Sequence, residues 1–227
     1  LEIVTTKPYL VDGFVITEET ELSGDEQYLF LGGTQVDTKV KLIEKKEVLS
    51  IYKPRDKFSH KGNFGHALII GGSYGKIGAV TLSSKAALSS GAGLVTAYVP
   101  KCGYQIIQSA FPEAMVITDN SEKIITDIDF LIEASAIGIG MGLGTDPETV
   151  KAFESFLKIY KAPIVIDADA LNILSKQKSL LKFLPKQSVL TPHPKELERL
   201  IGPWNDDFEK LQKVKEFSKQ FIIIVLR

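Results

Sequence analysis

The chain has 227 residues, enough for one or two domains with a sizeable hydrophobic core. Its 27 basic and 28 acidic residues give a formal net charge of −1, which excludes the basic excess of proteins that bind nucleic acid or anionic membranes. The single cysteine, Cys102, excludes an internal disulfide and fits a reducing compartment. We therefore expect a cytoplasmic protein without nucleic-acid or membrane partners.

Residues 1–50 mix short β-rich fragments with charged residues and contain no clear long amphipathic helix. The fragments are FVI, YLFLGG and VKLI. This composition predicts the tail of a preceding domain followed by a linker, whose polar hinge is KPRDKFSHKGN at residues 53–63. The second domain is expected to occupy residues 51–227.

From His66 onward, short β-branched apolar runs alternate with segments that favour helices. The runs that predict buried strands are residues 66–70, 94–100, 136–140, 163–167, 188–192 and 221–226. The predicted helices are residues 79–93, 145–160, 170–184, 194–202 and 206–220. Strands alternating with helices of this length indicate an α/β fold, with a mainly parallel central sheet covered by helices on both faces.

Ligands of such sheets bind in the crevice beyond the carboxyl ends of the strands. Four of the predicted strands are followed there by small or polar residues. These are Gly71, Gly72 and Ser73, then Gly142 and Gly144, then Asp167, Asp169 and Asn172, and finally Thr191 and His193. Because the four groups coincide at one edge of the sheet, we expect a ligand site at that edge.

The sequence GGSYGKIGA, residues 71–79, follows a strand and opens a helix. Glycines let the backbone approach a ligand, and a helix N-terminus offers N–H groups to an anion. The spacing differs from a Walker A loop by one residue, and Ile77 stands where Ser or Thr would coordinate magnesium. A phosphate-bearing ligand and a plain strand-to-helix turn are both compatible with this segment.

The sequence GIGMGLG, residues 138–144, has glycine at every second position and does not match the dinucleotide fingerprint. This pattern permits a strand end pressed against either a ligand or another backbone. Thr145 or Asp146 is expected to cap the helix that follows, with Pro147 in its first turn.

The sequence DADALN, residues 167–172, places two carboxylates at a strand end. Asp169 is a candidate helix cap. Asp167, at the tip of a buried strand, must be solvated, paired or functional. Metal-bound water, a ribose hydroxyl and a backbone nest would each suit it.

Of the three histidines, His193 is the functional candidate because it lies in the expected crevice. The histidine spacing predicts no zinc site, and we predict no metal ligands.

Four strings, taken in order and spacing, resemble the ADP- or ATP-dependent NAD(P)H-hydrate dehydratases over about residues 58–227. They are HKGNFGHALIIGGSYGKIGAVTLSSKAALSSGAGLVTAYVP, AIGIGMGLG, PIVIDADALN and VLTPHPKELERL. The resemblance implies a ribokinase-like fold and a lyase that dehydrates the (S)-epimer of hydrated NADH or NADPH. The implied reaction phosphorylates the ring hydroxyl and then eliminates phosphate, with ADP or ATP as co-substrate and Mg²⁺. A homo-oligomer, such as a tetramer, is also expected.

The resemblance also implies site residues. Ala79, Gly142 or Gly144, and His193 with Glu196 in the following helix start would contact the hydrated dinucleotide. Asn172 and Asp169 would lie near the same crevice, and Gly72, Ser73 and Asp167 are secondary candidates.

Two departures from the family pattern qualify this expectation. Met141 stands where the family usually has proline. The family's nucleotide-binding turn and catalytic Asp would follow Arg227, so we expect a fold that is incomplete at its C-terminal end and a chain that is inactive alone.

The segment EVLSIYKPRDKFSHKG, residues 47–62, resembles the junction with an epimerase (isomerase) domain in bifunctional relatives. The alternatives are a ribokinase-like vitamin-precursor kinase and a non-catalytic nucleotide-binding module.

Overall fold

The computed structural model describes residues 9–11, 14–16, 29–31, 34–36, 45–52, 54–128 and 133–226. The chain forms two compact units, Leu1–Ser59 and His60–Arg227. In the first unit, β1 (Tyr9–Val11) pairs antiparallel with β2 (Phe14–Ile16), and β3 (Leu29–Leu31) pairs antiparallel with β4 (Thr34–Val36). Helix α1 (Lys45–Ile51) follows. The β character predicted for FVI and YLFLGG is confirmed, whereas VKLI lies outside the described residues.

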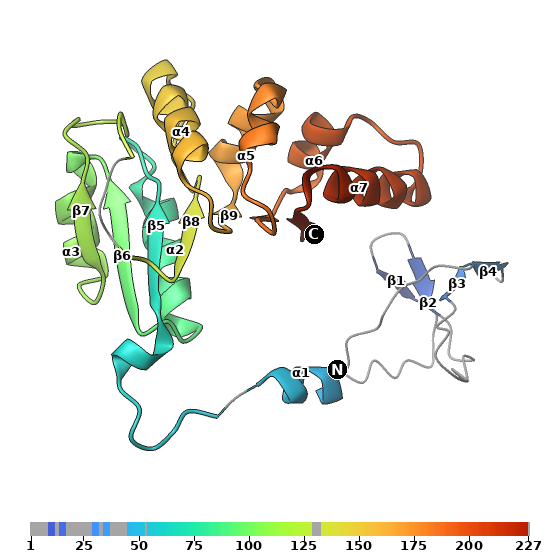
Figure 1. The fold of residues 1–227 in the computed structure, drawn as a ribbon, viewed down its shortest axis with the longest axis horizontal. Coiled ribbons are helices and arrows are strands. Elements are labelled where there is room, and N and C mark those ends of the chain that lie inside the picture. The colour runs from blue at the N-terminus through green and yellow to red at the C-terminus, as the bar shows by residue number, and fades with distance from the viewer. Residues whose placement is uncertain are drawn as a thin grey trace. The chain divides into compact units, whose positions relative to one another are not determined.

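The second unit is built on a seven-stranded parallel sheet (Figure 1). In chain order its strands are β5 (His66–Ile70), β6 (Leu94–Val99), β7 (Met115–Thr118), β8 (Ala136–Ile139), β9 (Val165–Ile166), β10 (Val189–Leu190) and β11 (Ile224–Val225). Their spatial order is β11-β10-β9-β8-β5-β6-β7. The chain thus adds strands first on one side of β5 and then on the other, so the topological switch point lies between β5 and β8.

Helices cover both faces of this sheet, as predicted. They are α2 (Ile77–Ser89), α3 (Tyr104–Ala110), α4 (Pro147–Ile159), α5 (Ala168–Lys176), α6 (Pro194–Ile201) and α7 (Asp207–Phe221), with 3₁₀ turns η1 (Lys61–Phe64), η2 (Lys101–Gly103) and η3 (Lys178–Phe183). Along β5, Ile69 packs with α2 and α3 in one core, whereas Leu68 and Ile70 pack with α4 and α5 in the other. This alternation follows from the two-residue period of a strand.

The predicted elements differ from the structure in three places. The segment that contains α3 and β7 was not assigned any element. The helix predicted at residues 170–184 is instead α5 followed by η3. The strand predicted at residues 221–226 is limited to β11, because α7 continues through Phe221 and Ile222 ends it in a left-handed conformation, with φ 54°.

Candidate functional site

The two glycine-rich turns that leave β5 and β8 interlock at the switch point. The Gly72 N–H donates to the Met141 backbone oxygen at 2.9 Å, and the Ser73 hydroxyl donates to the Gly142 backbone oxygen at 2.9 Å. Ser73 and Gly142 are both buried. The secondary candidates Gly72 and Ser73 therefore hold the turn at residues 140–144 in place.

Gly142 lies against the start of α2. Its φ is +68°, and an added Cβ atom would lie 2.6 Å from the backbone oxygen of Lys76 and 3.3 Å from the Cβ atom of Ala79. Of the two readings of the alternating glycines, the structure therefore favours a strand end pressed against another backbone. Ala79 itself is exposed beside this contact, so the structure brings the predicted residues Ala79 and Gly142 together.

Asp169 connects three segments of the site. Its Oδ2 atom accepts a hydrogen bond from the Gly144 N–H at 2.9 Å and lies 3.2 Å from Nζ of Lys76. Its Oδ1 atom lies 3.5 Å from Nδ2 of Asn172. The prediction that Asp169 caps a helix is wrong: Asp167 is the N-cap residue of α5 and makes no side-chain capping bond. The carboxylate of Asp169 instead satisfies a donor in the neighbouring turn. Of Thr145 and Asp146, Asp146 caps α4.

Asp167 is half-buried, and its Oδ1 atom accepts a hydrogen bond from the Thr191 hydroxyl at 2.9 Å. The next residue, Ala168, has φ 47°, a left-handed conformation that costs an alanine about 1–2 kcal/mol. Two backbone bonds hold this conformation: the Asp167 N–H donates to Ile139, and the Asp169 N–H donates to Gly140. Strain of this kind is concentrated at functional sites.

His193 starts α6 through a capping box with Glu196. The His193 N–H donates to Oε2 of Glu196 at 3.0 Å, and Nδ1 of His193 accepts from the Lys195 N–H at 3.2 Å. Glu196 is buried, with 6% of its surface exposed, whereas His193 is exposed. The capping box thus fixes the orientation of an accessible imidazole ring.

Asn172, on α5, is bonded to a residue of α6 that was not predicted. Its Oδ1 atom accepts a hydrogen bond from Nη1 of Arg199 at 2.7 Å. Arg199 lies 27 residues further along the chain, on an amphipathic helix where a lone arginine carries no recognisable signal. Lys76, which lies within GGSYGKIGA, was likewise not predicted as a site residue.

The segment at residues 119–128 braces the turn at residues 71–79. The Tyr74 N–H donates to the Lys123 backbone oxygen at 2.8 Å. Burial raises the pKa of Asp119, but four hydrogen bonds donated by the segment lower that pKa more, so it lies below its ordinary value. The donors are the N–H groups of Ser121, Thr126 and Asp127 and the Thr126 hydroxyl.

Within the described ranges, no group of three or more His, Cys, Asp or Glu side chains could hold a metal ion. The same part of the chain contains no helix that is both long and apolar enough to cross a membrane.

The Asp169→Ala variant tests the connection between the turns. Removal of the carboxylate leaves the Gly144 N–H without its acceptor, so we expect faster amide hydrogen exchange at Gly144 and a loss of about 1–2 kcal/mol in the free energy of unfolding. Lys76→Met is the control, because it removes only the half-exposed ion pair, whose contribution is small. Equal exchange at Gly144 in both variants would contradict this role of Asp169.

The model of the NAD(P)H-hydrate dehydratase family matches residues 67–227. The bifunctional NAD(P)H-hydrate repair enzyme Nnr of Moorella thermoacetica is 40% identical over 157 residues, which cover 65% of this chain and 29% of that protein. The ADP-dependent (S)-NAD(P)H-hydrate dehydratase of Lactococcus lactis subsp. lactis is 34% identical over 181 residues, or 79% of this chain and 64% of that protein. The chain thus spans less than two thirds of either relative.

Solved structures agree with this likeness. The ADP/ATP-dependent NAD(P)H-hydrate dehydratase from Bacillus subtilis, co-crystallised with ATP and Mg²⁺, has a TM-score of 0.60 at 25% identity, and the match covers 80% of this chain and 64% of that one. A ribokinase-like superfamily protein from Enterococcus faecalis has a TM-score of 0.64 at 24% identity, with 83% of this chain and 69% of that one covered. The expected ribokinase-like fold is confirmed.

Proposed function

Because the chain belongs to the NAD(P)H-hydrate dehydratase family, whose model matches residues 67–227, we propose that it carries the hydrate-binding part of a nucleotide-dependent dehydratase. The substrate is the (S)-epimer of hydrated NADH or NADPH, and the product is the repaired dinucleotide. The observation that carries the proposal is the meeting of the interlocked turns with Asp169 at the switch point, beside the exposed Ala79 and next to the cavity that Asp169 lines.

In the proposed reaction, the ring hydroxyl of the hydrate attacks the terminal phosphorus of ADP or ATP while a base accepts its proton, and the shortened nucleotide leaves. The ring C–O bond then breaks, phosphate departs, and loss of a ring proton restores the double bond. The residues of this chain position and shield the ring: Ala79 and Gly142 form one wall, and His193 faces the ligand from α6. We assign the base to none of the described residues.

The described residues fit Mg²⁺ as an ion carried by the nucleotide. Protein sites that bind Mg²⁺ together with phosphates use one or two carboxylates, and the phosphates supply further ligands. Asp169 is already engaged by Lys76 and Gly144, whereas Asp167 has a single hydrogen bond to its Oδ1 atom within the described ranges. Asp167, which was not predicted as a metal ligand, is therefore the carboxylate we propose for this role, in which the ion would neutralise charge on the phosphates.

We propose the same domain organisation as the bifunctional relative, with the dehydratase domain in residues 51–227 and the tail of an epimerase-like domain in residues 1–50. Homo-oligomerisation in the cytoplasm is also part of the proposal. Leu82 on α2 and Tyr104 and Ile106 on α3 expose 70%, 49% and 49% of their surfaces, which suits burial between subunits. Light scattering from the full-length protein measures the oligomeric state.

The test of the proposed reaction is incubation of the full-length gene product with hydrated NADH or NADPH, Mg²⁺, and either ADP or ATP. We expect the near-ultraviolet absorbance of the reduced nicotinamide to return, with one inorganic phosphate released for each dinucleotide repaired. A stable phosphorylated product without phosphate release would instead identify a kinase. No recovery with either nucleotide would overturn the proposal.

A further inference from the structure

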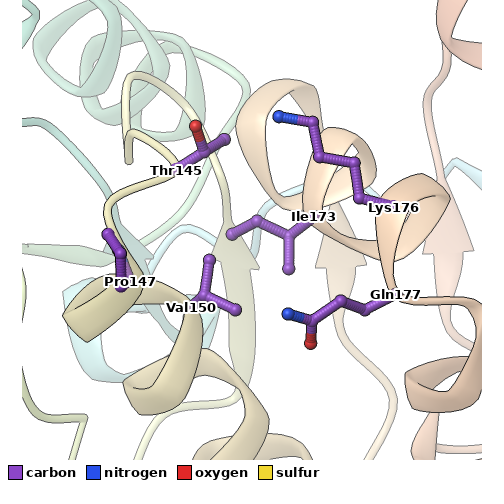
Figure 2. Close-up of a pocket in the computed structure, with 6 residues that line it drawn as sticks. All are labelled: Thr145, Pro147, Val150, Ile173, Lys176 and Gln177. Atoms are coloured by element: carbon purple, nitrogen blue, oxygen red, sulfur yellow. The ribbon is translucent and has the colours of Figure 1, made fainter.

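A basic cavity opens beside the crevice, between α5 and α6. It has a volume of about 570 Å³ and is lined by Thr145, Asp169, Asn172, Ser175, Lys176 and Arg199. A second pocket of about 290 Å³ adjoins it, because the two share Thr145 and Lys176. The lining of this adjoining pocket is completed by Pro147, Val150, Ile173 and Gln177 (Figure 2).

The basic cavity carries a net positive charge within a protein whose overall charge is −1. Its one carboxylate, Asp169, is paired with Lys76 at 3.2 Å. Within the described ranges, neither Lys176 nor Arg199 forms a salt bridge, and Arg199 gives one hydrogen bond, to Asn172. The remaining guanidinium donors and the Lys176 ammonium are thus available to an anion.

The cavity reaches the switch point through Asp169. Asp169 lines the cavity and also accepts a hydrogen bond from Gly144, in the turn that follows β8. Thr145, the next residue, lines both the cavity and the adjoining pocket. A ligand held at the switch point can therefore extend past Asp169 into the cavity.

We propose that Lys176 and Arg199 bind a phosphate group of the hydrated dinucleotide, a role that rests on the proposed function. A guanidinium group matches two phosphate oxygens at once, and an ammonium group adds a point charge. The dinucleotide offers its pyrophosphate and, in NADPH alone, a 2′-phosphate beside the adenine.

The adjoining pocket favours the adenosine end, and with it the 2′-phosphate. Figure 2 shows Pro147 and Val150 on one side of this pocket and Ile173 and Gln177 on the other. Apolar walls with one amide suit a purine base, which needs contact on its faces and a hydrogen-bonding partner at its edge. Lys176 and Arg199 then select NADPH hydrate over NADH hydrate.

Equilibrium binding of NADPH and NADH to the full-length protein, followed by nicotinamide fluorescence, tests this assignment. Lys176→Gln and Arg199→Gln are each expected to weaken NADPH binding by about tenfold while NADH binding stays unchanged. An equal loss for both dinucleotides would still assign phosphate binding to these two residues, but it would identify the pyrophosphate as the group that they bind. Arg199→Lys keeps the positive charge but cannot contact two phosphate oxygens at once, so its loss of NADPH affinity should be smaller than that of Arg199→Gln.

Lys178→Gln is the matched control, because it removes the same charge two residues from Lys176 at an exposed position that does not line the cavity. Unchanged binding in both test variants, an equal loss in Lys178→Gln, or no NADPH binding by the unaltered protein would each overturn the proposal. NADPH needs no turnover to bind. Selective binding by a protein without dehydratase activity would therefore support the phosphate subsite and overturn only the proposed reaction.

Discussion

In the full-length protein, the Gly142→Ala variant is expected to melt several degrees below the unaltered protein and to lose at least about tenfold in kcat/KM for the proposed substrate, the hydrated dinucleotide. An added Cβ atom would lie 2.6 Å from the Lys76 backbone oxygen, so the interlocked turns must move apart. Such overpacking costs about 1–3 kcal/mol. The left-handed conformation of an alanine adds about 1–2 kcal/mol. The displaced turn carries Ala79 away from its place beside the crevice.

Gly75→Ala is the control for this variant. Gly75 has φ +83°, and no described atom lies within 4 Å of the Cβ position, so this change introduces the backbone strain without the clash. Calorimetric melting of both variants isolates the steric part, which we expect to be roughly 2 kcal/mol, or about 4–8 °C for a domain of this size. Equal melting temperatures would contradict the close contact between the turns.

The second large effect is expected at Asp119, whose substitution by asparagine should reduce the free energy of unfolding by about 3 kcal/mol at neutral pH. Asp119 is 2% exposed, and its two carboxylate oxygens accept four hydrogen bonds from residues 121–127. An asparagine offers one acceptor oxygen and turns an NH₂ group toward the remaining donors. Chemical denaturation measures the loss.

The pH dependence of the free energy of unfolding shows whether this loss comes from the ionised form of Asp119. Because the folded-state pKa of Asp119 lies below its ordinary value of 3.8, its stabilisation is fully present above pH 3.8 and disappears as the pH falls through the folded-state pKa. The stability curves of the unaltered protein and of Asp119→Asn should therefore converge in acid. Asp127→Asn, which changes an exposed side chain in the same segment, is the control and should leave the free energy of unfolding at neutral pH nearly unchanged. Parallel curves for Asp119→Asn would show that its ionisation is not responsible.

Most of the sheet could be predicted from the sequence because its central strands are short apolar runs separated by amphipathic helices. The segment with α3 and β7 was missed for a physical reason. Helix α3 has seven residues and no side-chain cap, so it carries neither a long hydrophobic period nor a start signal. Strand β7 lies at the sheet edge, and its first residue, Met115, is 44% exposed, which weakens the apolar pattern.

The misplaced end of α7 shows a side-chain contact within the helix prevailing over the strand preference of single residues. FIIIVL favours a strand by its β-branched residues. Phe221 nevertheless stays helical and contacts Phe217, one turn earlier, with ring centroids 5.1 Å apart. Ile222 then takes the left-handed conformation that ends the helix. A strand propensity is assigned to each residue separately, so it does not include contacts between side chains.

At the site, the sequence indicated the correct edge of the sheet because glycines and carboxylates follow the strands that end there. It could not indicate which atoms these residues contact. The need for glycine at position 142 comes from the backbone of Lys76, and the bond from Arg199 to Asn172 joins two helices. Both depend on how distant elements pack against each other, and such packing leaves no repeating pattern in the amino-acid sequence.

The crevice is held by contacts between residues far apart in the chain, 69 positions for Ser73 and Gly142 and 93 positions for Lys76 and Asp169. Contacts of such sequence separation close long loops and form late in folding. The crevice is therefore a property of the native state alone, and a bound ligand must be released before the chain can unfold. Each tenfold increase in ligand above its dissociation constant adds about 1.4 kcal/mol to the free energy of unfolding. The lifetime of the folded protein would then rise with the amount of damaged dinucleotide that it is proposed to repair.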